Sequence, residues 1–418
     1  MAGELKGACI VGQSGGPTSV INSSIYGVIK TALENPNITE VLGSEYGIMG
    51  ILNDRLFDMS LEDPEELAKL PYTPSAELGS CRYKMKDPAK DDSDYIRILE
   101  IFRKYNVRYF FYNGGNDSMD TCNKISKYLQ QVGYECRVMG IPKTIDNDLF
   151  GTDHCPGYGS AAKYIATSCM EVYKDCHAYD TGQICIIEIM GRHAGWLTAA
   201  SAIAQKYGCG PDLIYLPERA FDMDDFLDRV EKIYNEKRFC VVAVSEGLRY
   251  EDGSFVSNAK TSVSDGFGHA QLGGLASLLT YLVSDRTHAK VRPIELSLLQ
   301  RCGAHLASQT DIDEAFRAGE AAVNLAVSGI TDMMVGFERS YVQGNYVCNI
   351  KLFNLTDVAN TEKKVPLEWI SEDGVGVTED FIDYVMPLIQ GESKRPACDS
   401  LPDFVKLKKM RYIPGRKL

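Results

Sequence analysis

The stretch CRVMGI at residues 136–141 runs directly into PKTIDND at residues 142–148. The first stretch has the composition of a buried strand, so we expect the second to leave its carboxyl end as a loop. Alternate side chains of an extended chain share a face, which would point Thr144, Asp146 and Asp148 into one cleft. One carboxylate there can accept a proton from a hydroxyl, another can hold a metal ion or a sugar hydroxyl, and the lysine can neutralise phosphate charge. This combination is typical of phosphoryl transfer, in which catalysis is mostly positioning and charge stabilisation.

The composition is that of an ordinary soluble protein, and 418 residues are enough for two or three domains. The formal net charge of -13 argues against non-specific binding to nucleic acid or to an anionic membrane. The sequence has no run of roughly 18 apolar residues and no secretory pattern, so we expect a cytoplasmic protein. The 13 cysteines include no CxxC pair and are expected to be reduced thiols.

Strand and helix patterns alternate along the first half of the chain, and the alternation then starts again. Strands are predicted at 8–12, 107–112, 136–141, 184–189, 213–216 and 239–244. Helices are predicted at 17–34, 94–105, 119–132, 161–175, 194–207, 223–236, from 268 to 284 and at 311–327. Such alternation predicts mostly parallel sheets with helices on both faces. We expect one domain at 1–155 and a second at 156–300, with part of about 300–340 packing back on the first and a mixed extension at 340–418.

Two glycine loops follow predicted strands and lead into predicted helices: QSGGPT at 13–18 and NGGNDS at 113–118. Glycines let backbone N–H groups approach a phosphate, and a helix N-terminus favours negative charge. Taken singly, the first loop is weak evidence because many tight turns carry two glycines, and an acidic helix cap explains the second loop slightly better than a phosphate site. Taken together with the carboxylate loop, the two glycine loops favour a phosphate site.

Further polar clusters also come after predicted strands or in loops. They are GSCR at 79–82 with Lys84 behind it, EIMGRHAGW at 188–196, SEG at 245–247, and Gln300-Arg301 with Arg292 upstream. An arginine fork can clamp a phosphate. Taken singly, a surface salt bridge is the more common fate of Glu246 or Arg301. The six histidines show no metal-ligand spacing and are expected in the core or at the surface.

In this order the clusters resemble the phosphofructokinase family. The resemblance runs from about Cys9 to Glu338, and its motifs are a glycine turn, LGS-x-R, GG-x-x-S, P-x-TIDND, E-x-MGR, a strand-end glutamate and QR. It implies an α/β fold of two Rossmann-like, doubly wound domains with the active site in the cleft between them. By the same resemblance the first domain binds the phosphoryl donor, the second binds fructose 6-phosphate, and a C-terminal tail follows.

The resemblance also implies a role for each matching residue. Asp146 matches the general base that takes the proton of the sugar 1-hydroxyl. The implied donor contacts are Gly15, Gly16, Arg82 and Ser118. The implied sugar-phosphate contacts are Thr144, Asp148, Met190, Gly191, Arg192, Glu246 and Arg301, to which we add Arg292. Mg²⁺ is implied as cofactor with Asn116, Asp117 and Asp148 as candidate ligands, and Asn116 replaces the family's usual aspartate.

Two positions indicate the phosphoryl donor. ATP-dependent members similar to the bacterial enzyme have glycine at the positions of Asp117 and Lys143, whereas pyrophosphate-dependent members have aspartate and lysine. The carboxylate of Asp117 would repel the α-phosphate of a nucleotide, and Lys143 can stabilise the leaving group of pyrophosphate. We therefore predict reversible phosphoryl transfer from pyrophosphate to fructose 6-phosphate, a reaction of glycolysis.

Several alternatives stay open. Gln183 and Leu298 depart from the family pattern, which permits a looser specificity that includes sedoheptulose 7-phosphate and weakens the expectation of a tetramer. A homodimer is the minimum expected, with a homotetramer as the larger assembly. An ATP-dependent enzyme and a non-catalytic subunit of a heteromer are the competing readings. A dinucleotide-dependent oxidoreductase ranks far below them because GxGxxG is lacking.

Overall fold

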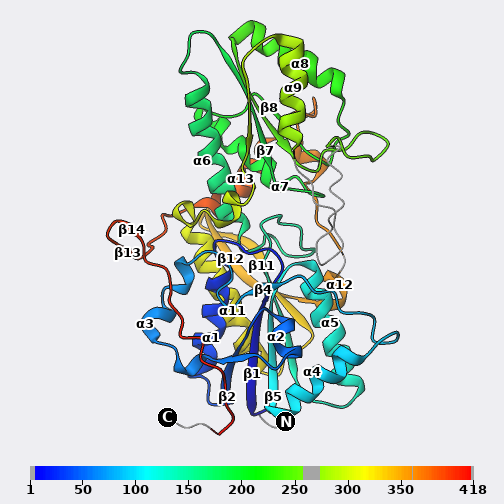
Figure 1. Ribbon diagram of the computed structural model, residues 1–418, viewed down its shortest axis with the longest axis vertical. Helices are drawn as coiled ribbons and strands as arrows, with labels where there is room; N and C mark the ends of the chain where they lie inside the picture. The colour runs from blue at the N-terminus through cyan, green and yellow to red at the C-terminus, as the bar shows by residue number, and fades with distance from the viewer. Residues whose placement is uncertain (1–4, 258–273, 360, 416–418) are drawn as a thin grey trace.

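The computed structural model describes residues 5–257, 274–359 and 361–415. The chain forms two lobes stacked along the long axis, each built around its own sheet (Figure 1). In the view of Figure 1 the larger sheet lies in the lower lobe and the smaller sheet in the upper lobe. The prediction of an α/β fold with two mostly parallel sheets is confirmed.

The lower lobe contains an eight-stranded sheet in the order β12-β11-β6-β5-β1-β2-β3, with β4 pairing with β1. Its central strands are parallel, whereas β3 and β12 run antiparallel to their neighbours. The strands are β1 (Gly7–Ser14), β2 (Ile38–Ser44), β3 (Leu56–Asp58), β4 (Ser80–Cys81), β5 (Val107–Gly114), β6 (Arg137–Pro142), β11 (Met333–Val342) and β12 (Asn345–Asn354).

Successive residues of each buried strand face opposite sides of this sheet, and helices cover both sides. Ile10 and Phe110 pack against one group of helices, which includes α4 and α5. Val11 and Phe111 pack against α1 and α11 on the other side. The helices of this lobe are α1 (Ile21–Glu34), α2 (Ile48–Leu52), α3 (Pro64–Leu67), α4 (Ser93–Lys104), α5 (Asn116–Gln131), α11 (Gln309–Val327) and α12 (Leu355–Val358).

The upper lobe contains a four-stranded parallel sheet in the order β10-β7-β9-β8. Ile187 and Val241 pack toward α6 and α7, whereas Ile186 and Val242 pack toward α8 and α9. The elements are α6 (Tyr158–Cys176), β7 (Gln183–Ile189), α7 (Trp196–Ala200), β8 (Leu213–Tyr215), α8 (Met223–Lys237), β9 (Phe239–Ser245), α9 (Leu275–Thr287), β10 (Val291–Glu295) and α10 (Leu299–Cys302).

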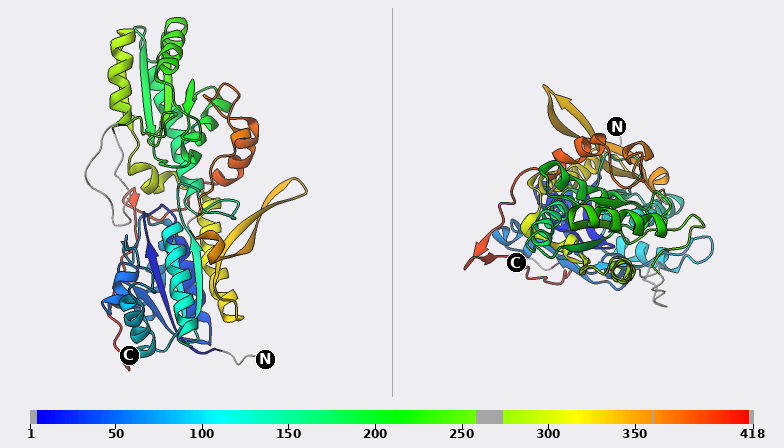
Figure 2. Two further views of the ribbon diagram at one scale, coloured as in Figure 1. Left: turned by 90° about the vertical axis from the view of Figure 1, so that its right-hand side faces the viewer. Right: turned by 90° about the horizontal axis from the view of Figure 1, so that it is seen from above.

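The C-terminal part of the chain contacts both lobes. Strands β11 and β12 form a hairpin whose base extends the large sheet and whose tip projects from the body (Figure 2). Helix α13 (Glu379–Val385) packs into the core of the upper lobe, and the chain then returns along the lower lobe, where Tyr412 N donates to Leu56 O at 2.9 Å. The expected domain limits stay a prediction, but the limit at 340 falls inside β11.

Several short elements connect the longer helices and strands. Turns of 3-10 helix lie at Met59–Leu61, Leu70–Tyr72, Ser201–Tyr207, Ala304–Leu306, Leu367–Trp369 and Met386–Ile389, and a small hairpin is formed by β13 (Ala397–Cys398) and β14 (Leu401–Pro402). Within the described ranges, every helix is too short or too polar to cross a bilayer. The cysteines are free thiols, and most of them are buried.

Three predicted helices differ from the observed ones. The helix expected from residue 17 begins at Ile21, because the backbone before it still turns, with Thr18 O accepting from Ser75 N at 3.0 Å. The helix expected at 194–207 ends at Ala200 and continues as a 3-10 turn, where Ser201 Oγ donates to Thr198 O and competes with the helical pattern. The helix expected from 268 lies partly outside the described residues, and its described part is α9.

Candidate active site

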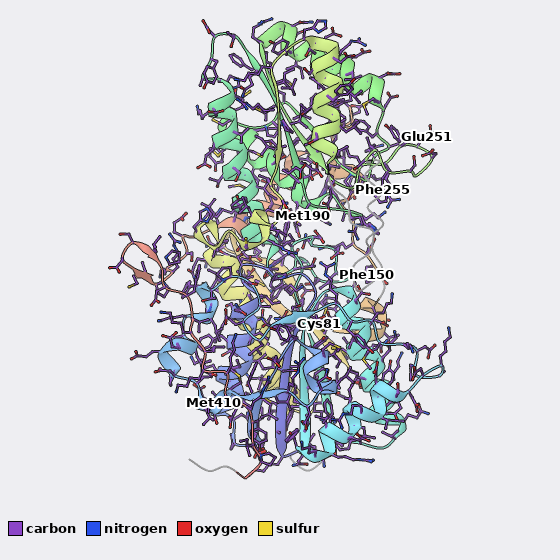
Figure 3. The ribbon with its side chains drawn as sticks, viewed as in Figure 1. Cys81, Phe150, Met190, Glu251, Phe255 and Met410 are labelled. Carbon is purple, nitrogen blue, oxygen red and sulfur yellow. The ribbon has the colours of Figure 1, made fainter. Side chains whose placement is uncertain are left out.

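A cavity of about 560 Å³ lies between the lobes, where the carboxyl ends of strands from both sheets meet. Figure 3 labels Met190 at the lower end of the upper lobe, with Cys81 and Phe150 below it in the lower lobe. The predicted site residues that line this cavity are Gly15, Gly16, Arg82, Asn116, Asp117, Ser118, Lys143, Thr144, Asp146, Asp148, Met190, Arg192, Glu246 and Arg301. Open α/β sheets place ligands at this edge, which is why strand-end motifs far apart in sequence come together here.

Two predicted site residues do not line the cavity. Gly191 has φ of +139°, and a Cβ there would lie 2.6 Å from Ala194 O, so its glycine is needed for the turn of the loop. Arg292 is exposed on β10, the edge strand of the upper sheet, and does not reach the cavity of its own chain.

Three cations converge on the glycine turn that follows β1. A Cβ on Gly15 would lie 3.2 Å from Lys143 Nζ, and a Cβ on Gly16 would lie 3.2 Å from Arg301 Nη1 and 3.7 Å from Arg82 Nη2. Lys143 Nζ donates to Gly16 O at 2.5 Å. The two glycines therefore give cations from three separate segments room to gather at one point.

The positive charges of these three side chains repel one another at the glycine turn, where they are partly removed from water. Burial, followed by the charge of Arg82, lowers the pKa of Lys143 to about 8. Burial and Arg82 also lower the pKa of Arg301. A ligand with several negative charges would relieve this repulsion, so the turn is prepared for a polyanion such as a chain of phosphates.

The carboxylate loop follows β6 and faces the cations. Asp146 N donates to Thr144 Oγ1 at 3.1 Å, which fixes the backbone at the centre of the loop. Burial, followed by the charges of Asp148 and Glu246, raises the pKa of Asp146 to about 7. An aspartate with an ordinary pKa of about 4 is a weak base, whereas a value near 7 suits proton abstraction at neutral pH.

Oxygen ligands suited to a divalent cation lie beside this loop. Asn116 Nδ2 donates to Asp148 Oδ2 at 3.5 Å, and Asn116 Oδ1 is buried without a hydrogen-bond donor among the described residues. Asp117 follows directly and also lines the cavity. Carboxylate and amide oxygens are the ligands that Mg²⁺ prefers, so the donor set fits the predicted metal site.

Asp117 also has the local structural role that the sequence offers as the alternative explanation of its loop. It lies in the first turn of α5, where the helix dipole stabilises a negative charge, and its Oδ1 is 4.0 Å from Lys84 Nζ. The same turn would otherwise attract a phosphate group. The carboxylate therefore occupies a place in the cavity that is suited to an anion.

The upper lobe contributes a loop after β7 and a glutamate after β9. Met190 N donates to Gln300 Oε1 at 3.2 Å, so the residue before Arg301 holds the start of this loop. Gly191 N donates to Glu246 Oε1 at 3.4 Å, and burial raises the pKa of Glu246. Arg192 lines the cavity from this side.

Four polar residues that line the cavity were given no role from the sequence: Thr18, Lys84, His193 and Glu362. His193 Nδ1 donates to Glu362 Oε1 at 3.0 Å. Burial and then Glu362 raise the pKa of Asp148. His193 could have been found because it follows Arg192 directly, but Glu362 lies in a charged run of the C-terminal part that gave no such signal.

Comparisons with known proteins agree with this geometry. A sequence model described as phosphofructokinase matches residues 8–326. A relative from Halomonas elongata, named pyrophosphate--fructose 6-phosphate 1-phosphotransferase, is 43% identical over 413 residues, which are 97% of this chain and 98% of the relative. A sulfofructose kinase from Alkalicoccus urumqiensis is 33% identical over 365 residues, 87% of this chain and 88% of the relative. The crystal structure of pyrophosphate-dependent phosphofructokinase from Marinobacter aquaeolei superposes with a TM-score of 0.87 at 40% identity, covering 99% of this chain and 98% of that one.

Proposed function

The chain belongs to the phosphofructokinase family, and we propose that it transfers a phosphoryl group reversibly from inorganic pyrophosphate to the 1-hydroxyl of fructose 6-phosphate. The products are fructose 1,6-bisphosphate and phosphate, as in glycolysis. The observation that carries this proposal is the convergence of Lys143, Arg82 and Arg301 on the glycine turn, opposite a carboxylate whose pKa is about 7. The names of the Halomonas and Marinobacter relatives support the same donor.

In the proposed reaction each lobe binds one of the two substrates. Arg82 and Lys143 hold the pyrophosphate oxygens against the glycine turn, while Arg192 and Glu246 hold fructose 6-phosphate from the other side. As the 1-hydroxyl oxygen attacks phosphorus, Asp146 accepts its proton, and the bond between phosphorus and the bridging oxygen of pyrophosphate breaks. The leaving phosphate takes that electron pair, and Lys143 stabilises the charge that develops on it.

The position of Asp117 supports the choice of donor. A nucleotide would have to place its α-phosphate near the start of α5, where this carboxylate now lies. Like charges close together repel each other, and the repulsion is stronger in a partly buried cavity than in bulk water. Pyrophosphate has no third phosphate group to place near the start of α5, so it avoids the repulsion from Asp117.

We further propose Mg²⁺ as the cofactor, held by Asp148, Asp117 and the orphan amide oxygen Asn116 Oδ1. When bound, the ion neutralises charge on the phosphates. Glu362 and Asp146 also line this side of the cavity. Their carboxyl groups make the electrostatic potential there more negative, which favours a cation.

We also propose a cytoplasmic enzyme that is at least a homodimer, with a homotetramer as the larger form. Arg292 cannot serve the cavity of its own chain, and Leu298 and Leu299, a few residues further on, are 53% and 58% exposed. A second copy that covers these residues would let Arg292 contact the acceptor of its partner.

A matrix of donors and acceptors tests the function. Pyrophosphate or ATP is offered with fructose 6-phosphate, sedoheptulose 7-phosphate or sulfofructose, the last because of the name of the Alkalicoccus relative. We expect turnover with pyrophosphate and fructose 6-phosphate. Turnover with ATP alone would establish the ATP-dependent alternative, and an inactive pure chain would favour the non-catalytic subunit.

A further inference from the structure

Residues 361–365, which we call the strap, pass between the lobes beside the cavity. Glu362 forms an isolated antiparallel bridge with Leu149, and Lys363 N donates to Asp148 O at 2.8 Å. The backbone of the strap is therefore joined to the loop that carries the catalytic carboxylates.

The side chain of Lys363 anchors the strap more firmly. Its Nζ donates to Thr152 O at 3.1 Å and to Asp153 O at 2.7 Å, and it lies 4.9 Å from the centroid of the Trp196 ring. Burial lowers the pKa of Lys363. Two carbonyl acceptors and one aromatic face replace the water that this ammonium group has lost.

The opposite edge of the strap contacts the loop at residues 190–196 of the upper lobe. Trp196 Nε1 donates to Lys363 O at 3.0 Å. Glu218 Oε1 accepts from both Val365 N at 3.1 Å and Gly195 N at 2.8 Å. The strap thus links the catalytic loop of one lobe to the arginine-bearing loop of the other.

His193 and Glu362 are the two residues of this link whose side chains interact at the cavity. Both side chains line the cavity, and they are 39% and 40% exposed, so they stand at its wall rather than in a core. His193 is the immediate neighbour of Arg192. The bond from His193 to Glu362 therefore restrains the loop at the residue next to the guanidinium.

Arg192 depends on such outside support. Its Nε is buried and has no hydrogen-bond acceptor among the described residues, so no bond at this atom fixes the guanidinium. The preceding residue, Gly191, has a φ that few other residues adopt, and glycine leaves the backbone more conformations. The orientation of Arg192 is consequently set by the contacts of its loop. Ser245 and Glu246 hold the preceding residue, Gly191, and Glu362 of the strap holds the following residue, His193.

We propose that Glu362 and His193 are positioning residues for Arg192, through which the C-terminal strap sets the affinity for the anionic end of the acceptor. This inference rests on the proposed function, in which Arg192 holds fructose 6-phosphate, and it assigns to Arg192 the phosphate of that substrate. It gives the C-terminal part of the chain a role in choosing the acceptor. It leaves the donor side, formed by the glycine turn of the other lobe, unaffected.

The test compares Glu362→Ala and His193→Ala with the wild type at saturating levels of one substrate while the other is varied. Each variant should raise KM for fructose 6-phosphate about tenfold and leave KM for pyrophosphate within about twofold. The double variant should be no worse than either single variant, because both remove the same link. His193→Asn keeps a donor at the position of Nδ1 and should restore most of the affinity.

A second comparison separates positioning from direct contact with the sugar. In an Arg192→Met background, adding His193→Ala should change KM for fructose 6-phosphate by less than about twofold. If the two losses add, His193 touches the acceptor itself and the positioning role is overturned. Equal increases in KM for both substrates, or no increase, would also overturn it.

The control variant Glu338→Ala breaks an exposed ion pair with Lys351 on the hairpin, away from the cavity, and should change neither KM. Quenching of tryptophan fluorescence by fructose 6-phosphate without pyrophosphate provides a readout that needs no turnover. One outcome would contradict the proposed function and keep the positioning role. In it the wild type is inactive but still binds fructose 6-phosphate, and Glu362→Ala and His193→Ala lose that affinity. Wild-type turnover together with unchanged affinity for fructose 6-phosphate in these variants would support the proposed function and contradict the positioning role.

Discussion

Asp146 and Lys143 line the same cavity, and their pKa values have moved toward neutrality from opposite sides. Burial and neighbouring carboxylates raise the pKa of Asp146 to about 7, while burial and neighbouring arginines lower the pKa of Lys143 to about 8. In the proposed mechanism the base must lose its proton to act, and the lysine must keep its proton to stabilise the leaving phosphate. Both conditions hold together in a narrow range of pH.

The first prediction is therefore a bell-shaped profile of kcat/KM for pyrophosphate. The rate should rise through about pH 7 as Asp146 ionises and fall above about pH 8 as Lys143 loses its charge, since kcat/KM reports the free enzyme. Initial rates across this range measure it. Lys143→Met should lose the alkaline limb, and a limb that survives in this variant would belong to pyrophosphate rather than to the lysine.

The second prediction concerns the choice of donor. Asp117→Gly combined with Lys143→Gly should lower kcat/KM for pyrophosphate by about 10²-fold or more and relax the exclusion of ATP, since it removes both the repelling and the stabilising charge. Competition between the two donors at a fixed level of fructose 6-phosphate measures the change. A double variant with the donor preference of the wild type would remove the basis of the donor assignment.

At this scale the sequence predicted most residues of the site, because each motif keeps its chemistry within a few positions. It could not predict the pKa of Asp146, which depends on Glu246 from the other lobe. Glu362 was missed for the same reason, since only folding brings the C-terminal strap to the cavity. The contact of Gly191 with the sugar phosphate stays a prediction, and the structure adds that the turn of the loop requires glycine at this position.

At the scale of elements, a buried ion cluster joins α11 to the segment between β6 and α6. His154 Nε2 lies 2.7 Å from Glu314 Oε2 and its Nδ1 lies 2.8 Å from Asp153 Oδ1. Burial alone would lower the pKa of His154, but the two carboxylates outweigh it and raise the pKa to about 9. With both ring nitrogens donating, this group of His154, Glu314 and Cys348 does not fit a metal ion.

The third prediction follows from that cluster. Because the folded-state pKa lies above the ordinary value of about 6.5, the stabilisation is fully present below about pH 6.5 and is lost as the pH rises through about 9. His154→Gln should lower the free energy of unfolding at about pH 6 by on the order of 2 kcal/mol, and by less at about pH 9.5. Urea unfolding of both proteins at the two pH values measures it, and a constant difference would show that folding does not change the pKa of His154.

The elements that the sequence predicted are those with long, regular patterns, such as α8 and β9. Strand β2 was missed because Thr39 and Glu40 interrupt its apolar pattern, and β10 because it carries a proline and lies exposed at a sheet edge. The hairpin of β11 and β12 was taken for the start of a mixed tail, since many of its side chains are exposed and its pattern is weak.

At the scale of the whole molecule, two lobes meet at one cavity and the C-terminal part contacts both (Figure 1). The sequence could predict two α/β units from the repeated alternation of strand and helix. It could not predict that α13 returns to the upper lobe and that the last residues return to the lower one, because these contacts depend on single side chains rather than on periodic patterns.

The fourth prediction tests the assembly. Asp146→Ser and Arg292→Met should each be nearly inactive alone. If Arg292 serves the cavity of a partner, mixed dimers contain one cavity with both an intact base and an intact arginine, so mixing after mild dissociation should restore activity. Light scattering on the wild type should show at least a dimer. A fully active monomer, or a mixture without recovery, would contradict the shared site.

The most direct test of the central claim follows pyrophosphate and fructose 6-phosphate by phosphorus NMR in the presence of the purified chain and Mg²⁺. The account predicts that the pyrophosphate signal declines while a sugar 1-phosphate ester and free phosphate grow in equal amounts, and that the reverse occurs from fructose 1,6-bisphosphate and phosphate. Pyrophosphate that stays intact, or that is hydrolysed to phosphate without ester formation, would contradict it.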